Sequence, residues 1–372
     1  MPDPAGQALD NPPTSQTAGV PADASATDPM IPARSFARLI ASALWIALPL
    51  ALAALALGYL WPQSDIRDAK WHELLSFAAF MVRTFLFQGG IAAACAAVLA
   101  LIIRRRMLAV AWALVAIPLL GPELRYYLPS KPPPIRGETV RVMSVNLLRS
   151  ALRPDDMLTE ILGADADVLC LQEYSNRWDA RIGAALRRRY PFVSITPRED
   201  SFGVALCSKR PFLTPVIDDI GIGTWGLPQQ RTQIEIDGQR VNVFNIHIPP
   251  PSPRFRPTRG DSHALEQRRC WEDLRTLLAR VDGPTLICGD FNATLRSHIG
   301  AGMSALGFLD AHEIAGYGRG STWPADGNIR QYLPGVRIDH IFLRGLTAGA
   351  SRVGVGPGSD HHPIAAEIGF PQ

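Results

Sequence analysis

Residues 284–294 place a carboxylate and an amide two positions apart, directly after a short apolar run. The run Thr285–Cys288 is too short for a helix and predicts a buried strand, and Asp290 and Asn292 follow it. Residues two apart at the end of a strand can point toward one face. Loops at strand ends are where α/β enzymes carry their chemistry. Because Asp-x-Asn is also a common turn sequence, the meaning of this pair depends on the rest of the chain.

Polar residues stand at the end of a predicted strand at four further places. Strands usually end in Gly, Asn, Asp, Ser or Pro, so a glutamate and a histidine at such positions are informative. Any one of these residues alone favours a structural hydrogen bond over catalysis. Together they predict one site along a common sheet edge. The residues are Asn146, Glu173, His247, Asp339, and the adjacent pair Asp360 and His361.

These residue types suit the hydrolysis of phosphate esters. Glutamate and asparagine oxygens are the hard ligands that Mg²⁺ prefers, and such an ion polarises a phosphoryl oxygen and offsets developing charge. A carboxylate beside an amide can activate and orient an attacking water. A histidine next to a buried aspartate keeps its proton, because the negative charge favours the charged imidazole. The sequence therefore predicts a phosphohydrolase that uses Mg²⁺, with Mn²⁺ as the alternative ion.

The same motifs, in this order, resemble the endonuclease/exonuclease/phosphatase family, which has the DNase-I-like fold. They are Val-Asn146, Leu-Gln-Glu173, Asn-x-His247, Gly-Asp290-Phe-Asn292, Arg-Ile-Asp339-His and Ser-Asp360-His361-x-Pro. The resemblance covers about residues 139–370. It implies an α/β four-layer sandwich of two mixed sheets flanked by helices, and a Mg²⁺-dependent phosphohydrolase.

The resemblance also implies a role for each motif residue. Glu173 is similar to the principal metal ligand, with Asn146 beside it and Asp360 as a further acid on the metal side. Asp290 resembles the group that activates water or protonates the leaving group, and Asn292 its orienting partner.

Three further residues complete the catalytic set that the resemblance implies. His361 is similar to the histidine that contacts the phosphate, Asp339 to its buried partner, and His247 to the second histidine of the site. His340 and His362 are interpreted as structural.

The N-terminal third predicts a membrane anchor. Residues 1–33 are rich in Pro, Ala and Ser and lack aromatic residues, which is typical of a disordered tail. Residues 34–124 hold about three apolar segments, at Leu39–Leu60, Thr84–Ile103 and Met107 to about Pro122, long enough in the first two cases to cross a bilayer. A cleaved signal peptide is the alternative for the first segment, but its apolar region would be shorter and nearer the start.

Charges around these segments predict the orientation. Arg34, Arg38 and the triplet Arg104–Arg106 favour the cytoplasmic side. Three spans would then place the rest of the chain outside the inner membrane of the cell, as a multi-pass protein. If the third segment, which contains Pro118, does not span, the domain is cytoplasmic instead. Residues 125–138 predict a Pro-rich extended spacer, followed by the catalytic domain at 139–372.

Short apolar runs alternate with helical patterns in this domain. Strands are predicted near Val140–Val145, Asp167–Leu171, Phe192–Ile195, Val204–Cys207, Thr232–Ile236, Val241–Ile246, Thr285–Cys288, Ile338–Leu343 and Ile364–Ile368. Helices are predicted at Pro154–Gly163, Trp178–Arg189 and His263–Val281.

The charge of the domain argues against a general nucleic-acid binder. From Gly137 to Gln372 we count 26 Arg or Lys and 26 Asp or Glu, so this region is neutral. It also lacks a run of basic and aromatic residues that would line a duplex groove. Four arginines are candidate ligands for a phosphate headgroup, although a solvated loop and an ordinary strand arginine explain them equally well. They are Arg231, Arg254, Arg256 and Arg259.

The predicted anchor and the predicted chemistry together define the functional hypotheses. The arrangement resembles that of membrane-anchored family members associated with teicoplanin resistance, and this resemblance implies a phosphatase for lipid-linked pyrophosphate, such as undecaprenyl pyrophosphate, at the outer membrane surface. One alternative is an extracytoplasmic nuclease or phosphodiesterase, with nucleic acid as the partner. The other is a catalytically silent protein that uses the fold for binding at the cell envelope, which would not need so many acidic and histidine residues.

Overall fold

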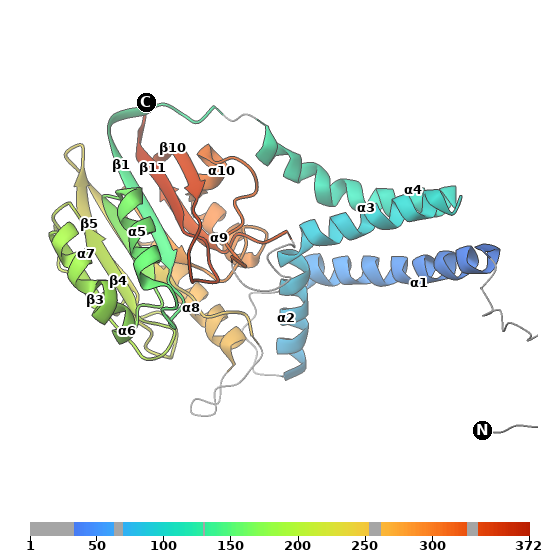
Figure 1. Cartoon of the computed structure of the whole chain (residues 1–372), viewed down its shortest axis with the longest axis horizontal. Helices are drawn as coiled ribbons and strands as arrows, with labels where there is room; N and C mark the ends of the chain where they lie inside the picture. Colours follow the sequence, from blue (N-terminus) through green and yellow to red (C-terminus); the bar gives the residue numbers. More distant parts are fainter. Residues whose placement is uncertain (1–32, 63–69, 129–130, 253–261, 326–333) are drawn as a thin grey trace, which may run out of the picture.

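The computed structural model describes residues 33–62, 70–128, 131–252, 262–325 and 334–372. These residues form a helical stem and an α/β domain packed against one end of it (Figure 1). The predicted disordered tail lies outside the described residues except for Ala33, the first residue of α1. Arg254, Arg256 and Arg259 lie outside them as well.

Two mixed sheets form the centre of the domain. The six-stranded sheet has the order β10-β11-β1-β2-β4-β3, and the five-stranded sheet the order β5-β6-β7-β9-β8. The first consists of β1 (Ile135–Asn146), β2 (Val168–Gln172), β3 (Phe192–Thr196), β4 (Val204–Ser208), β10 (Thr347–Val353) and β11 (Ile364–Pro371). The second consists of β5 (Gln230–Ile236), β6 (Gln239–His247), β7 (Thr285–Asp290), β8 (Leu309–Asp310) and β9 (Asp339–Arg344).

Helices cover the outer face of each sheet, which confirms the predicted four-layer sandwich. Between the sheets lies one apolar cluster, in which Val142 and Cys170 pack against Cys288 and Ile341. Because the central strands are covered on both faces, they read as nearly continuous apolar runs. On the six-stranded sheet lie α5 (Pro154–Ala164), α6 (Asn176–Trp178), the π-turn η2 (Asp179–Gly183) and α7 (Ala184–Arg189); on the five-stranded sheet lie α8 (His263–Leu278) and α9 (His298–Ala305), while α10 (Ala311–Ala315) packs beside β10.

Two strand assignments differ from the sequence-based expectation. β1 begins at Ile135, five residues before the predicted start at Val140, because its first residues pair with the end of β11. β10 has the sequence Thr-Ala-Gly-Ala-Ser-Arg-Val, which has little intrinsic strand preference. It forms an edge strand because β11 supplies the hydrogen-bond partners.

The stem contains helices that are apolar enough to span a membrane. α1 (Ala33–Leu60) is one, and α4 (Arg106–Leu120), continued by the 3-10 turn η1 (Gly121–Tyr127), is another. α2 (Lys70–Thr84) and α3 (Leu86–Ile102) meet at an angle of 68° and count as a third span only if the bent pair is taken as one. This agrees with the prediction of about three spans.

α3 and α4 form a tight hairpin. A Cβ atom on Gly90 would lie 2.8 Å from the Leu120 side chain, so the glycine permits the close approach. The turn at Arg104–Arg105 lies at the end of the stem far from the domain, as does the beginning of α1 (Figure 1). The basic residues at both places therefore lie on the same side.

The domain is fixed on the stem by ion pairs and a shared core. Glu123 of η1 accepts hydrogen bonds from Arg296 (2.7 Å) and Arg319 (2.9 Å). Arg125 contacts Glu313 at 2.5 Å. Phe80 of α2 belongs to the apolar cluster beneath α8 and α9. Stem and domain thus pack directly, with η1 overlapping the first residues of the predicted spacer.

The exposed and buried faces of α2 are the reverse of those of a water-soluble surface helix. Its polar residues His72, Glu73 and Ser76 are buried toward the molecule, and Glu73 accepts a hydrogen bond from Ser262. Trp71 and Leu74, by contrast, are 61% and 60% exposed. An outward apolar face with an aromatic residue is typical of a helix that lies in the membrane interface.

His298 makes stability depend on pH at the contact between α2 and the domain. Burial, reinforced by Arg268 and Arg83, lowers the pKa of His298 to about 4. An unfolded histidine titrates near its model value of 6.5, so the unfolded state binds more protons between these values and stability falls as the pH drops from 6.5 toward 4. We expect His298 to account for a loss of about 2 kcal/mol at pH 5 relative to pH 7.5.

Thermal unfolding of the full chain at the two pH values measures this loss, and His298→Gln should reduce it. His263→Gln is the matched control, because His263 also follows a serine N-cap at the start of a helix but is half-buried. An equal acid loss in wild type and His298→Gln would contradict the prediction.

Candidate active site

The register of three adjacent strands aligns three of the predicted residues. His247 on β6 pairs with Asp290 on β7, and Asp290 pairs with Asp339 on β9. Gly289 lets β7 approach β6 at this point, since its φ is 150° and a Cβ atom there would lie 1.8 Å from the Ile246 carbonyl oxygen. The five-stranded sheet therefore presents an imidazole and two carboxylates in a row at one edge.

Asp290 lies at the centre of the cluster and is fully enclosed by it. Asn146, from the end of β1 in the other sheet, donates Nδ2 to Asp290 Oδ2 at 2.9 Å. Asn292 donates its backbone N–H to Oδ1 (2.7 Å) and its Nδ2 to Oδ2 (3.2 Å). Nε2 of His247 lies 3.6 Å from Oδ2 and Nε2 of His361 lies 3.8 Å from it. The carboxylate is thereby held in one orientation.

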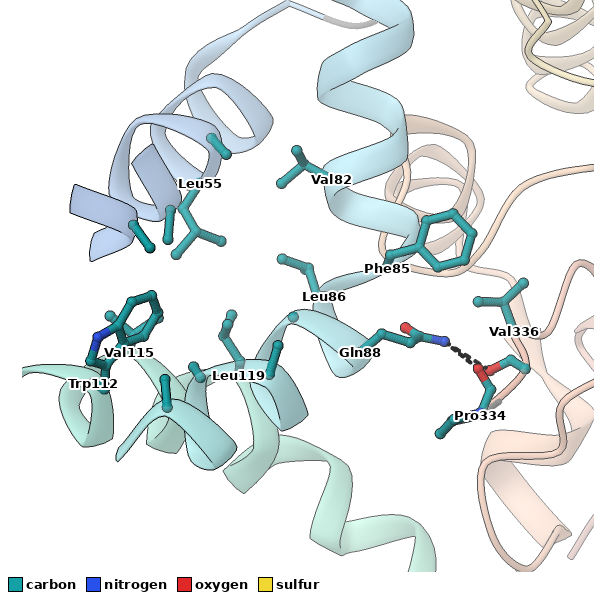
Figure 2. A pocket seen from close by; sticks show the side chains of 18 of the residues that line it. Leu55, Val82, Phe85, Leu86, Gln88, Trp112, Val115, Leu119, Pro334 and Val336 are labelled. Atoms are coloured by element: carbon teal, nitrogen blue, oxygen red, sulfur yellow. Dashed lines mark hydrogen bonds between the residues drawn. The ribbon is translucent and has the colours of Figure 1, made fainter. Parts of the chain in front are cut away.

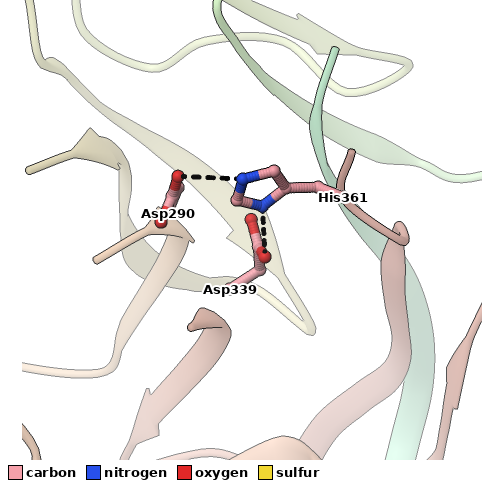
Figure 3. Close-up of side chains that lie close together, drawn as sticks. All are labelled: Asp290, Asp339 and His361. Carbon is pink, nitrogen blue, oxygen red and sulfur yellow. Dashed lines mark hydrogen bonds and ion pairs between the residues drawn. The ribbon is translucent and has the colours of Figure 1, made fainter. Parts of the chain in front are cut away.

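His361 is held between two carboxylates (Figure 3). Its Nδ1 lies 2.8 Å from Asp339 Oδ2, while Nε2 faces Asp290. Burial opposes the charged form, but Asp339 and Asp290 outweigh it and raise the pKa of His361 to about 10. The ring is therefore an imidazolium at neutral pH. By contrast, burial and the nearby His361 lower the pKa of His247 to about 4, which leaves His247 neutral.

Glu173 and Asn146 lie beside each other at the ends of β2 and β1. Asn146 Nδ2 is 3.4 Å from Glu173 Oε1, and the Arg149 backbone N–H donates to Oε2 at 2.9 Å. Glu173 has a φ of 57° and Asn292 a φ of 47°. Such conformations cost about 1–3 kcal/mol in a residue other than glycine and concentrate at functional sites. Two of the predicted residues thus carry the backbone strain expected of a working site.

The structure does not bring every predicted residue into this cluster. Asp360 precedes His361 and its charge raises the pKa of that imidazole, but none of the described hydrogen bonds involves its side chain. Arg231 lies over the Phe244 ring, 5.3 Å from its centre, and Phe244 packs in the apolar cluster beneath α8 and α9. No described contact joins Arg231 to Asp290, so its role as a phosphate ligand stays a prediction.

The two histidines interpreted as structural have partners of their own. His340 contacts Asp310 through Nδ1 at 2.7 Å and the Ala293 carbonyl through Nε2 at 2.9 Å. His362 Nδ1 lies 2.7 Å from the Val355 carbonyl. Neither ring nitrogen of His340 is left to contact a substrate.

Sequence reasoning missed the residues that position the site. Ser359 accepts a hydrogen bond from the His361 backbone and donates one to the Asn146 carbonyl at 2.7 Å. Thr322 Oγ1 accepts from the Asp339 N–H at 3.1 Å. Gln229 bonds both backbone groups of His247. Ser359 stands inside the Ser-Asp-His motif and could have been found there, whereas no pattern marks the other two.

The cluster fits a divalent cation. Ligand atoms of Asp290, Asp339 and His361 lie within 4.8 Å of one another, and all three residues are buried. Asp339 Oδ1 is buried without a hydrogen-bond partner among the described residues. Burial, together with the neighbouring Asp339 charge, raises the pKa of Asp290, and burial raises that of Glu173. Several buried carboxylates with unmet acceptor capacity are what a hard cation such as Mg²⁺ satisfies.

A sequence comparison decides the family. The model described as "Endonuclease/Exonuclease/phosphatase family" matches residues 143–361. The chain belongs to this family. Proteins of the endonuclease/exonuclease/phosphatase family are metal-dependent phosphoesterases and nucleases, which is the chemistry that the donor set suits, and the chain is an enzyme of this class.

Relatives in the endonuclease/exonuclease/phosphatase family are distant. A UPF0294 protein of Vibrio parahaemolyticus is 26% identical over 222 residues, which cover 55% of this chain and 69% of the relative. An exodeoxyribonuclease of Bacillus subtilis is 26% identical over 152 residues, covering 40% of this chain and 56% of the relative. The chain thus spans little more than half the length of the second relative.

Solved structures of the same fold include two bacterial proteins. An endonuclease/exonuclease/phosphatase from Bacteroides vulgatus is 17% identical with a TM-score of 0.48, covering 63% of this chain and all of the other. A 3′ phosphatase from Neisseria, bound to a product DNA hairpin, is also 17% identical, with the same TM-score and the same coverage.

We expect a divalent ion to stabilise the protein through Glu173. A ligand that binds only the folded state at 100 times its dissociation constant adds about 2.7 kcal/mol of stability. Mg²⁺ should therefore raise the unfolding temperature of the wild-type chain, and chelation should reverse the rise. Glu173→Gln should remove most of it, because the amide carries no charge.

The measurement is a thermal shift across a Mg²⁺ titration, and it needs no substrate. Glu160→Gln is the control, since Glu160 is a carboxylate of α5 that bonds the Val355 N–H away from the cluster. An equal Mg²⁺ shift in the wild type and in Glu173→Gln would show that Glu173 is not a ligand.

Proposed function

We propose that this protein is a membrane-anchored phosphatase that releases phosphate from a lipid-linked pyrophosphate, such as undecaprenyl pyrophosphate. The observation that carries the proposal is the direct packing of a phosphoesterase domain on an apolar helical stem, through Glu123 and Phe80. A domain fixed in this way acts on substrates presented at the membrane surface. The neutral charge of residues 137–372 agrees with a small headgroup better than with a long polyanion.

The proposed roles of the residues follow from their contacts. Asp290 is the base that takes a proton from the attacking water, because burial raises its pKa toward neutrality. Asn292 holds both Asp290 oxygens and so orients the base. His361, kept charged by Asp339, donates from Nε2 to a phosphoryl oxygen. His247 is neutral and packs against the other side of Asp290, which limits the rotation of the carboxylate.

Glu173, Asn146 and Asp360 are the proposed metal ligands. When bound, the ion supplies polarisation of a phosphoryl oxygen and offsets the charge that develops there. Glu173 Oε1 faces Asn146, and the Arg149 N–H fixes the other carboxylate oxygen, so the donor is already oriented.

Phosphate release is the test of this proposal. The full chain in detergent with Mg²⁺ should release phosphate from undecaprenyl pyrophosphate, and Asp290→Asn should not. Absence of release by the wild-type protein would refute the proposed substrate.

The proposed location is the inner membrane with the domain outside the cytoplasm. Arg38 and the Arg104–Arg106 turn lie at the end of the stem away from the domain (Figure 1), and basic residues favour the cytoplasmic side. A reporter fused after Gln372 should be active only if it folds outside. A cytoplasmic result would remove cell-wall lipids from the substrates and favour soluble phosphoesters.

A nuclease or phosphodiesterase is the second candidate, favoured by the likeness to the Bacillus exodeoxyribonuclease. Nicking of plasmid DNA by the full chain, absent in Asp290→Asn, would support it. A silent binding protein would hydrolyse neither substrate.

A further inference from the structure

A large apolar cavity lies between the stem helices and the catalytic domain (Figure 2). Its volume is about 830 Å³, within the range of ligand-binding pockets. α1 contributes Leu55, α4 contributes Trp112 and Leu119, and α3 contributes small residues such as Gly89. The cavity is thus enclosed by helices that are apolar enough to span a membrane.

The wall on the domain side belongs to the loop that ends in the active site. Trp323 and Val336 line the cavity and pair with each other through backbone hydrogen bonds. Gln88 of α3 donates its Nε2 to the Pro334 carbonyl at 2.5 Å, which ties this loop to the stem. Val336 precedes Asp339 by three residues, so their Cα atoms are at most about 10 Å apart.

A second connection runs from the same loop to the other side of the site. Thr322, the neighbour of Trp323, accepts a hydrogen bond from the Asp339 N–H, and its carbonyl accepts one from the His362 N–H. The Ala325 N–H donates to the Asp360 carbonyl at 2.8 Å. One short loop therefore forms both the end of the apolar cavity and the support of the catalytic residues.

We propose that this cavity binds the hydrocarbon chain of the lipid whose phosphate is hydrolysed, an inference that rests on the proposed function. The two halves of such a substrate differ in chemistry in the same way as the two sides of the loop. On one side, a histidine cation and a cluster suited to a divalent ion match a phosphate. On the other side, the apolar walls match a chain that leaves the bilayer without entering water.

Filling the cavity tests the proposal. A Cβ atom on Gly89 would meet no atom within 4 Å, so Gly89→Trp projects a side chain into the cavity without a clash at the backbone. Gly121→Trp is the matched control, because Gly121 is also helical and open at Cβ but does not line the cavity. Both full-length variants should unfold at temperatures close to that of the wild type.

The kinetic readout compares a long and a short substrate at equal Mg²⁺. For undecaprenyl pyrophosphate, Gly89→Trp should raise KM by about tenfold or more with a smaller change in kcat, since uniform binding is lost. For isopentenyl pyrophosphate, which is too short to fill the cavity, KM should change by less than about twofold. Gly121→Trp should alter neither. Equal effects on both substrates, or none on the long one, would overturn the inference.

Photo-cross-linking separates this inference from the proposed function. A long-chain polyprenyl phosphate with a photoreactive group at the end of its chain should label stem residues such as Trp112 in the wild type and lose this label in Gly89→Trp. Labelling without any phosphate release would refute the phosphatase proposal and leave the cavity assignment standing. Phosphate release without labelling of the stem would refute the cavity assignment alone, with the lipid chain remaining in the bilayer.

Discussion

Replacing Asp290 by asparagine is expected to lower kcat by about 10²–10⁴-fold, the usual contribution of a positioned general acid or base. The amide has the same shape, but it cannot take a proton from water. Asp290 is 1% exposed and touches four other polar residues of the site, so no group on another element can replace it. The measurement is single-turnover phosphate release under saturating Mg²⁺, alongside thermal unfolding.

Asp156→Asn is the control for the Asp290 variant. Asp156 is a carboxylate on the exposed surface of α5, where it pairs with Arg153 at 2.8 Å. Its substitution should leave kcat unchanged. If Asp290→Asn unfolds at the wild-type temperature and keeps more than about a tenth of wild-type kcat, Asp290 is not the base.

His361→Gln is expected to lower kcat by about 10²–10³-fold, the loss typical of removing one donor to a developing oxyanion. Glutamine keeps a donor but not the positive charge that Asp339 and Asp290 sustain on the imidazole. Asp339→Asn should also lower kcat, since the buried partner that favours the imidazolium would be gone.

The double variant shows whether the two residues act as one unit. If Asp339 works through His361, then Asp339→Asn should cost little more once His361 has become glutamine, because residues in one hydrogen-bonded pair are not additive. His340→Gln is the control for a buried histidine bonded to an aspartate outside the catalytic row. Fully additive losses would contradict the pairing and assign Asp339 a separate role.

Much of the site could be predicted because each of its residues follows a strand. The runs before Asn146, Glu173, His247 and Asp290 are apolar on both faces, and such runs end at sheet edges. The fold class followed from the alternation of these strands with helices.

The supporting contacts could not be predicted in this way. Gln229 and Thr322 lie in loops of irregular structure, and they reach His247 and Asp339 only because distant segments fold back on the sheets. The same is true of the stem, where Glu123 meets Arg296 across 173 positions of sequence. Hydrophobic periodicity reports which face of an element is buried, but not which loop will cover it.

The contact between Glu123 and the domain has a consequence for how a soluble fragment would behave. A chain cut within residues 125–138 would leave Arg296 and Arg319 without their shared carboxylate. It would also uncover the apolar surface that receives Phe80. Such a truncated protein would expose a sticky patch beside an unneutralised basic pair, and a low yield or weak turnover from it would report the missing helices rather than the chemistry of the enzyme.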